Sequence, residues 1–252
     1  MKFTGNEFIS YNTNPFTYTG IITIDWGDNT IETYAGGALT HTYASNDNYT
    51  IIITGNISAI NNATRYSDST LTAGVFRVNG LNYVSLPSSI ISIGDLSFYN
   101  NTDLTEIYLS KNIMTLGGNL FRGCTNLSEI IFPPNVTEIP KYCCYNCSNL
   151  ISVVLPPNLI TFTDYNCFSN CDLHSLDVPK TVTNIKYSYF NNNSNLTNVI
   201  LNWDTSETIL TLGDSNWNNN VCSTTIFSIP PNTTMLYYKK GYSLSQLIER
   251  EV

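Results

Sequence analysis

Residues 104–126 read LTEIYLSKNIMTLGGNLFRGCTN, and residues 127–149 read LSEIIFPPNVTEIPKYCCYNCSN. The two segments align without a gap, and both open with Leu-x-x-Ile followed by further apolar residues. The opening leucine recurs at 23-residue steps: Leu81, Leu104, Leu127, Leu150 and Leu173, with Leu196 starting a longer and less regular copy. Self-similarity at a fixed period of about 20–50 residues predicts a solenoid built from stacked copies of one unit.

Each unit predicts a short strand and a return of the chain across a core. The fourth and sixth residues are apolar, which places alternate side chains of one strand on an inner face. Proline cannot donate to a sheet ladder and therefore ends the strand; the prolines are Pro87, Pro133, Pro156 and Pro179. A second apolar pair follows, and a closing Asn or Asp suits a tight turn. One unit cannot bury its own apolar edge, whereas stacked units can.

The units resemble the BspA-like leucine-rich repeats, over residues 81–195 well and over 196–222 poorly. The resemblance implies a binding surface and no particular chemistry. A later column of each unit is bulky or contains sulfur: Phe98, Phe121, Cys144, Cys167 and Phe190. Cys124 and Cys147 share a second column. Shared columns predict buried packing thiols, although Cys144-x-x-Cys147 and its neighbours leave a thiolate metal site as the alternative. We expect no metal and no cofactor.

Residues 1–60 lack the repeat and predict a separate small β-domain. Strand-like alternation appears at 22–26 and 49–53, and Gly27, Asp28 and Asn29 form a turn between strands. The segments IDWGDN, HTY and NYTIIITG together resemble a polycystic-kidney-disease (PKD) domain, with Asn29 and Asn48 in place of two usual glycines. The resemblance implies a trimmed β-sandwich that serves as an extracellular spacer or adhesion module. Trp26 and His41 are expected in core or turn roles.

The predicted fold class is mainly β: a small PKD-like or immunoglobulin-like β-sandwich, then a leucine-rich-repeat solenoid with 23-residue repeats, then a cap. The expected boundaries are 1–60 for the β-domain, 61–80 for a transition in which residues 75–78 cap the solenoid, 81–222 for the repeats and 223–252 for the C-terminal cap. The repeats are regular over 81–195 and degenerate over 196–222. In the cap, residues 225–229 predict a last strand and residues 243–249 a short helix.

Composition excludes several classes of function. The net charge is −8 and the pI is about 4.6, which argues against nucleic acid and anionic membrane surfaces. No apolar run approaches the ~18 residues of a spanning helix, so no membrane insertion is expected. The first residues lack the apolar region of a secretory signal. Together with Met1, this favours a phage particle released by lysis over secretion.

Catalytic motifs are absent from the sequence: it has no G-x-S-x-G, no H-E-x-x-H and no phosphate loop. Its two histidines leave few arrangements for a nucleophile and a base. A Cys/His-dependent enzyme using Cys171 and His174 remains a remote alternative, without an orienting third group. We therefore expect a protein that is not an enzyme and has no catalytic residues.

The third and fifth residues of each repeat strand should face away from the core. They form an exposed ribbon of apolar side chains rimmed by polar ones, which indicates an interface or, alternatively, a ladder that only stabilises the sheet. The ligand-binding candidates on this face are Tyr83, Glu106, Tyr108, Glu129, Ile131, Val154 and Ile200.

The sequence thus predicts a non-enzymatic recognition or structural protein. The preferred interpretation is a phage virion component, such as a fibre, tail or capsid decoration, exposed on the virion surface. The alternative is a bacterial cell-surface adhesin. Expected partners are other virion or surface proteins and host glycans or proteins.

Overall fold

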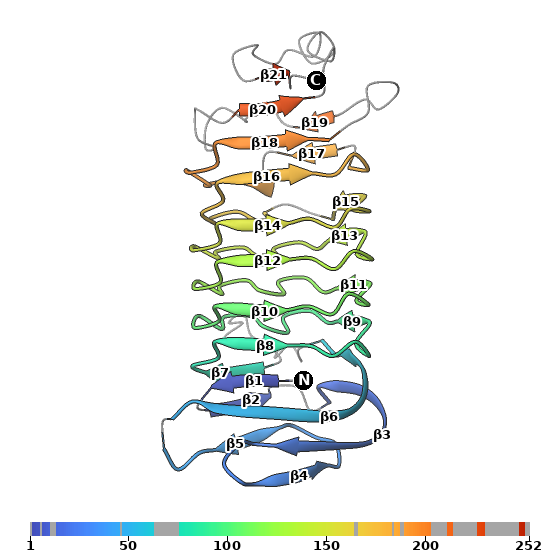
Figure 1. The fold of residues 1–252 in the computed structure, drawn as a ribbon, viewed down its shortest axis with the longest axis vertical. Coiled ribbons are helices and arrows are strands. Elements are labelled where there is room, and N and C mark those ends of the chain that lie inside the picture. Colours follow the sequence, from blue (N-terminus) through green and yellow to red (C-terminus); the bar gives the residue numbers. More distant parts are fainter. Residues whose placement is uncertain are drawn as a thin grey trace, which may run out of the picture.

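Stacked β-strands run along most of the chain in the computed structural model (Figure 1). The structure describes residues 2–5, 7–10, 14–45, 47–62, 76–163, 166–182, 184–186, 189–202, 211–213, 226–229 and 247–249. Within these ranges the regular elements are strands, so the predicted mainly β class is confirmed.

The repeats place their strands in two rows (Figure 1). The first row contains the strands of the Leu-x-x-Ile type of pattern and two further strands after them: β8 (Tyr83–Ser85), β10 (Glu106–Tyr108), β12 (Glu129–Ile131), β14 (Ser152–Val154), β16 (Ser175–Val178) and β18 (Asn198–Leu201), then β20 (Ile226–Ile229) and β21 (Leu247–Glu249). The second row carries the second apolar pair and contains β9 (Ser92–Ile93), β11 (Thr115–Leu116), β13 (Glu138–Ile139), β15 (Thr161–Phe162), β17 (Asn184–Lys186) and β19 (Thr211–Gly213).

Strand register confirms the 23-residue unit. Ile107 pairs with Val84, and Ile130 with Val153, in parallel ladders that step by one repeat. The inner column of the first row is buried throughout: Val84, Ile107, Ile130, Val153, Leu176 and Val199. Buried apolar residues every second position fix the register, because a slip of one residue would turn the whole column outward.

The N-terminal segment forms two sheets. β1 (Lys2–Gly5), β6 (Tyr49–Ile60), β3 (Phe16–Asp25) and β4 (Ile31–Tyr34) lie side by side, and β2 (Glu7–Ser10) lies between β5 (Thr40–Thr42) and β7 (Phe76–Asn79). The predicted strands at 22–26 and 49–53 are present within β3 and β6, which extend further. Asn29 takes a positive φ of 72°, as the predicted turn requires.

This N-terminal unit is joined to the first repeat through its backbone. β1 pairs antiparallel with both β6 and β8, and the end of β6 pairs parallel with β9. β6 thus adjoins the first row through β1 and pairs directly with β9 of the second row. Together β1 and β6 cover the open edge of the solenoid. The sequence assigned this closing role to residues 75–78. Among the described residues, 76–79 form the strand β7, which pairs with β2, and the Phe76 N–H donates to the Ser97 carbonyl of the first repeat at 3.1 Å.

A single core runs from the N-terminal unit into the repeats. The ring of Phe76 lies 5.7 Å from that of Phe16 and 6.0 Å from that of Phe98, which stacks at 5.7 Å on Phe121. All four rings are buried. Since aromatic side chains bury large areas and pack in preferred offset or edge arrangements, this column ties the two parts together.

Two sequence predictions are wrong in detail. Residues 247–249 form β21, a strand parallel to β20, in place of the last part of the predicted helix; residues 243–246 lie outside the described residues. The exposed edge of β20 offers unpaired backbone groups, which a strand satisfies and a helix would not. The other error concerns Cys167, which does not occupy the column of Cys144. Phe168 does, and it stacks on Phe190 at 6.1 Å.

Candidate interaction surface

The outer face of the first row carries the predicted ribbon. Tyr108 is 54% exposed, Ile131 59% and Val154 46%, and the carboxylates of Glu106 and Glu129 beside them are exposed. These side chains lie on β10, β12 and β14, which stack in order (Figure 1). Exposed apolar side chains in a row, rimmed by polar ones, have the arrangement expected of an interface.

The two ends of the ribbon are less open. Tyr83 on β8 and Ile200 on β18 are half-buried. Tyr83 contacts Tyr108, with 5.7 Å between ring centroids. On β16 the outward position is Asp177, so the apolar row is interrupted before Ile200. The orientation predicted for all seven candidates agrees with the strand registers, and binding by them remains a prediction.

Hydrogen bonds hold the rim in place. The Tyr108 hydroxyl donates to Oε1 of Glu106, and this bond to a negatively charged carboxylate raises the pKa of Tyr108. The Ser152 hydroxyl donates to Oε1 of Glu129 at 3.4 Å. These hydrogen bonds fix the positions of the two carboxylates on the surface.

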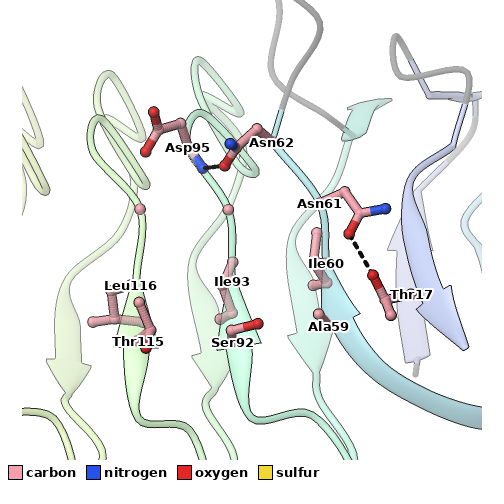
Figure 2. Close-up of a pocket in the computed structure, with 12 residues that line it drawn as sticks. Thr17, Ala59, Ile60, Asn61, Asn62, Ser92, Ile93, Asp95, Thr115 and Leu116 are labelled. Atoms are coloured by element: carbon pink, nitrogen blue, oxygen red, sulfur yellow. Dashed lines mark hydrogen bonds between the residues drawn. The ribbon is translucent and has the colours of Figure 1, made fainter.

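A groove of about 610 Å³ lies where β6 meets the second row (Figure 2). Its polar side chains hold the chain together: Thr17 Oγ1 donates to Asn61 Oδ1 at 2.8 Å, and the Asp95 backbone N–H donates to Asn62 Oδ1 at 2.7 Å. A Cβ atom on Gly117 would lie 2.2 Å from the Asp95 nitrogen. Glycine is therefore required there by the close approach of two turns of backbone.

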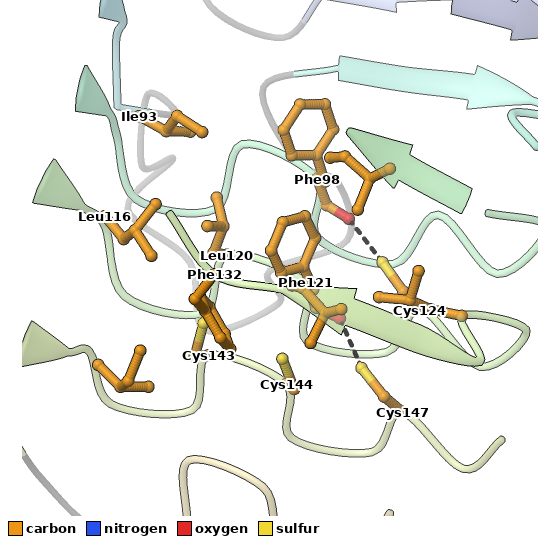
Figure 3. Close-up of a cluster of buried hydrophobic side chains, with 14 of the residues drawn as sticks. Ile93, Phe98, Leu116, Leu120, Phe121, Cys124, Phe132, Cys143, Cys144 and Cys147 are labelled. Carbon is orange, nitrogen blue, oxygen red and sulfur yellow. Dashed lines mark hydrogen bonds between the residues drawn. The ribbon is translucent and has the colours of Figure 1, made fainter. Parts of the chain in front are cut away.

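The cysteines occupy the core, as the shared columns predicted (Figure 3). Six of the seven are described, and all six are buried free thiols; Cys222 lies outside the described residues. Three of them donate from Sγ to a backbone carbonyl of the preceding unit at 3.1 Å: Cys124 to Phe98, Cys147 to Phe121 and Cys171 to Cys144. Burial raises the pKa of the Cys124, Cys144 and Cys171 thiols.

Asparagine takes the same position at both ends of this series. Asn101 Nδ2 donates to the Phe76 carbonyl at 3.0 Å, and Asn193 Nδ2 donates to the Phe168 carbonyl at 2.8 Å. One buried donor per unit therefore satisfies a carbonyl that would otherwise be unpaired in the core. The cysteines act as structural donors in this ladder, which favours packing over the thiolate metal site.

The Cys171–His174 pair has no shared site. The Cys171 thiol faces the core, where it bonds the Cys144 carbonyl, while the His174 side chain is 58% exposed. The imidazole Nε2 lies 3.9 Å from Asp172 Oδ2 at the surface. A nucleophile must be reachable by its base and by a substrate, and this arrangement meets neither condition.

Trp26, His41 and Asp28 form one packed cluster at a turn. The Trp26 and His41 rings stack at 4.5 Å, and His41 Nε2 lies 2.8 Å from Asp28 Oδ2. The Tyr43 hydroxyl donates to the Trp26 carbonyl at 2.8 Å. Hydrogen bonds from Thr30 and His41 lower the pKa of Asp28 to about 2. The predicted core and turn roles of Trp26 and His41 are confirmed.

Sequence reasoning missed an aromatic cluster around Arg122. The guanidinium carbon lies 5.8 Å from the ring centroid of Tyr99, 5.5 Å from that of Tyr142 and 5.0 Å from that of Tyr145. Tyr99, Arg122 and Tyr145 stand at 23-residue steps, so the repeat columns contained the necessary signal. The contacts are those of a cation held over aromatic faces, which stabilises a charged side chain on a crowded surface.

Within the described ranges, no group of three or more His, Cys, Asp or Glu side chains lies close enough together to hold a metal ion. The same residues contain no helix with the length and apolarity needed to cross a membrane.

Parallel strands repeated once per 23-residue turn define the class of this protein: a leucine-rich-repeat β-solenoid. The family described as BspA type leucine rich repeat region, in six copies, matches residues 69–197 and 147–245. These matches together cover more than half of the sequence, and the chain belongs to this family.

One solved structure supports the fold, and a second is reported with it. A leucine-rich repeat protein from T. pallidum is 21% identical, with a TM-score of 0.52 over 73% of this chain and 88% of that one. A leucine-rich cell surface protein from Faecalibacterium prausnitzii A2-165 is 16% identical, with a TM-score of 0.46 over 71% of this chain and 60% of that one. No protein with a curated description is similar enough in sequence to match.

Proposed function

We propose that this protein is a non-enzymatic recognition protein displayed at a bacterial cell surface, where it binds a partner through the outer face of its first strand row. The exposed row of Tyr108, Ile131 and Val154 carries this proposal. Covering exposed apolar side chains with a partner is favourable by roughly 25 cal/mol for each Å² of apolar surface removed from water.

Family membership supports the cell-surface setting over the virion. The BspA-type repeats match most of the chain, and the resemblance seen in the sequence associates such repeats with bacterial surface proteins. The same resemblance also extends to phage structural proteins. A role as a virion component therefore stays a prediction, which no comparison supports.

We also propose that the N-terminal unit is PKD-like and acts as a spacer or anchor. The Trp26–His41 stack and the bond from Tyr43 to the Trp26 carbonyl use the residues on which the resemblance rests. A crystal structure of the full chain tests this assignment, because the strand order of the N-terminal unit can then be compared with that of PKD domains.

Binding by the strand face is tested with labelled full-length protein and two variants. Ile131→Asp places a charge in the exposed row, whereas Met114→Asp places the same charge at an equally open site, 61% exposed, beside the second row. Each protein is applied to immobilised extracellular proteins and glycans. The proposal predicts a partner that retains the wild type and Met114→Asp and loses Ile131→Asp. Equal retention of all three would rule out this face.

A further inference from the structure

The outward-facing row of residues continues beyond the first repeat into the N-terminal unit, where polar residues separate the apolar ones. In a β-sheet, residues directly opposite one another point to the same face. Tyr108 is opposite Ser85, Ser85 is opposite Lys2, and Lys2 is opposite Ile52. Ile52 is opposite Asp25, and Asp25 is opposite Ile31 at the far edge of the sheet. The strand register therefore extends the row from Tyr108 on β10 to Ile31 on β4, and the 23-residue repeat continues it in the other direction to Ile200 on β18.

Burial supports this assignment independently of the register. Ile31 is 67% exposed and Ile52 is 41% exposed, while Ile51 and Ile53, the neighbours of Ile52 in β6, are buried on the opposite face. The strand order β10-β8-β1-β6-β3-β4 carries the row without a break across the junction. At about 4.8 Å per strand, the ten strands from β4 to β18 span roughly 40 Å.

Acidic residues outnumber basic ones along this face, where the register places one lysine, Lys2, in the row. In the strands whose side chains are described, the outward charges beside the row are the carboxylates of Asp25, Glu106, Glu129 and Asp177. The whole chain is also acidic, with a net charge of −8. A second copy would place carboxylates against carboxylates, and an anionic lipid surface would be repelled in the same way.

We infer that Ile31 and Ile52 together with Tyr108, Ile131 and Val154 form one docking surface, with Lys2 and Ser85 between the two apolar groups, for a basic protein segment that carries apolar side chains in a line flanked by lysine or arginine. This inference rests on the proposed function, and it adds the N-terminal unit to the binding surface and names the chemistry of the partner. Charge complementarity steers such a partner to the face and sets its orientation.

The test uses a fluorescent 20-residue peptide whose leucines form a single helical stripe flanked by lysines. The control peptide has glutamate in place of each lysine. Fluorescence anisotropy with the full chain should show binding of the lysine peptide, weakening as salt is raised, and no binding of the glutamate peptide. Equal binding of both peptides, or of neither, would overturn the basic-partner inference.

Variants locate the surface. Ile31→Thr combined with Ile52→Thr keeps β-branched residues in the strands and should weaken binding of the lysine peptide about tenfold, as truncation of an interface anchor does. Met114→Thr combined with Ile160→Thr is the matched control, at sites 61% and 58% exposed outside the row, and should leave binding unchanged.

Failure of this inference is distinguishable from failure of the proposed function. If Ile131→Thr weakens binding and the Ile31/Ile52 variant does not, the face of the repeats binds and its extension is wrong. If Ile131→Thr also has no effect, the proposed function fails as well. A wild-type dimer that Ile52→Thr dissociates in sedimentation experiments would make a second copy the occupant and overturn the inference.

Discussion

Asp28 shows how one turn residue can couple stability to pH. Its carboxylate accepts bonds from the Thr30 hydroxyl at 2.5 Å and from the Thr30 backbone N–H at 3.1 Å, and it contacts His41. These bonds lower the pKa of Asp28 to about 2 from a model-compound value of 3.8. The unfolded chain therefore binds this proton more tightly, so the contribution to stability is present above pH 3.8 and is lost as the pH falls towards 2.

We expect Asp28→Asn to lower the melting temperature at pH 7 and to flatten its decline between pH 4 and pH 2. Thermal unfolding followed by circular dichroism at each pH measures both effects. Asp103→Asn, at an exposed site, controls for the general loss of one charge. A variant as steep in pH as the wild type would show that Asp28 is not the coupled group.

Leu127 and Ile131 lie on the same repeat and should respond in opposite ways to the same substitution. Leu127 is fully buried, so Leu127→Asp puts an unpaired charge in the core and should unfold the solenoid, at a cost well above the ~2–5 kcal/mol of a truncation to alanine. Ile131→Asp should leave the melting temperature nearly unchanged. The melting temperatures of the two variants are compared by thermal unfolding. A folded Leu127→Asp variant and an unfolded Ile131→Asp variant would mean that the two faces of the strand are the reverse of this assignment.

At the scale of the repeat element, the buried donor ladder makes a separate contribution. Asn193 is fully buried, donates to the carbonyls of Phe168 and Phe190 at 2.8 Å each, and accepts from the Leu173 backbone N–H at 3.0 Å. Asn193→Ala leaves these groups unsatisfied, and we expect a loss of about 1–3 kcal/mol for each.

Urea unfolding measures this loss as a lower midpoint with an unchanged slope. Asn195→Ala is the matched control, because its side chain is exposed and bonds Asp172 at the surface. A similar small effect for both asparagines would show that the ladder adds little to stability.

The sequence predicts the repeat elements well because their physical cause is periodic. A fixed 23-residue step makes each inner residue stand above the next, so Val84, Ile107 and Ile130 could be assigned together. The fourth unit escaped this logic. Leu150 and Leu173 keep the step, yet Phe168 sits one residue later than the column predicts. An added residue inside the unit, compensated before its end, leaves the leucine spacing unchanged.

The ends of the molecule were harder to predict, because their structure depends on partners distant in sequence. Residues 247–249 carry a helix-like local pattern, but the edge of β20 draws them into a strand. Similarly, β1 pairs with β8 of the first repeat, although the four residues of β1 contain no pattern that predicts this pairing. The candidate surface was predictable on the repeats by columns; its continuation to Ile52 required the register across β1.

For the whole molecule, the continuous aromatic column predicts joint unfolding of the N-terminal unit and the repeats. With Trp203→Phe and Trp217→Phe in place, Trp26 is the one tryptophan and reports on the N-terminal unit. We expect its fluorescence transition to coincide with the loss of far-ultraviolet circular dichroism. Phe98→Ala should shift both transitions together, by about 3–5 kcal/mol. Two separated transitions would show that the two parts unfold independently.

The most direct test of a surface recognition protein is protease treatment of intact cells of the source organism, followed by mass spectrometry of the released peptides. The account predicts that peptides from this chain, including those spanning Tyr108 and Ile131, are released while the cells stay intact. Recovery of the chain with purified phage particles, or from the cell interior alone, would contradict it.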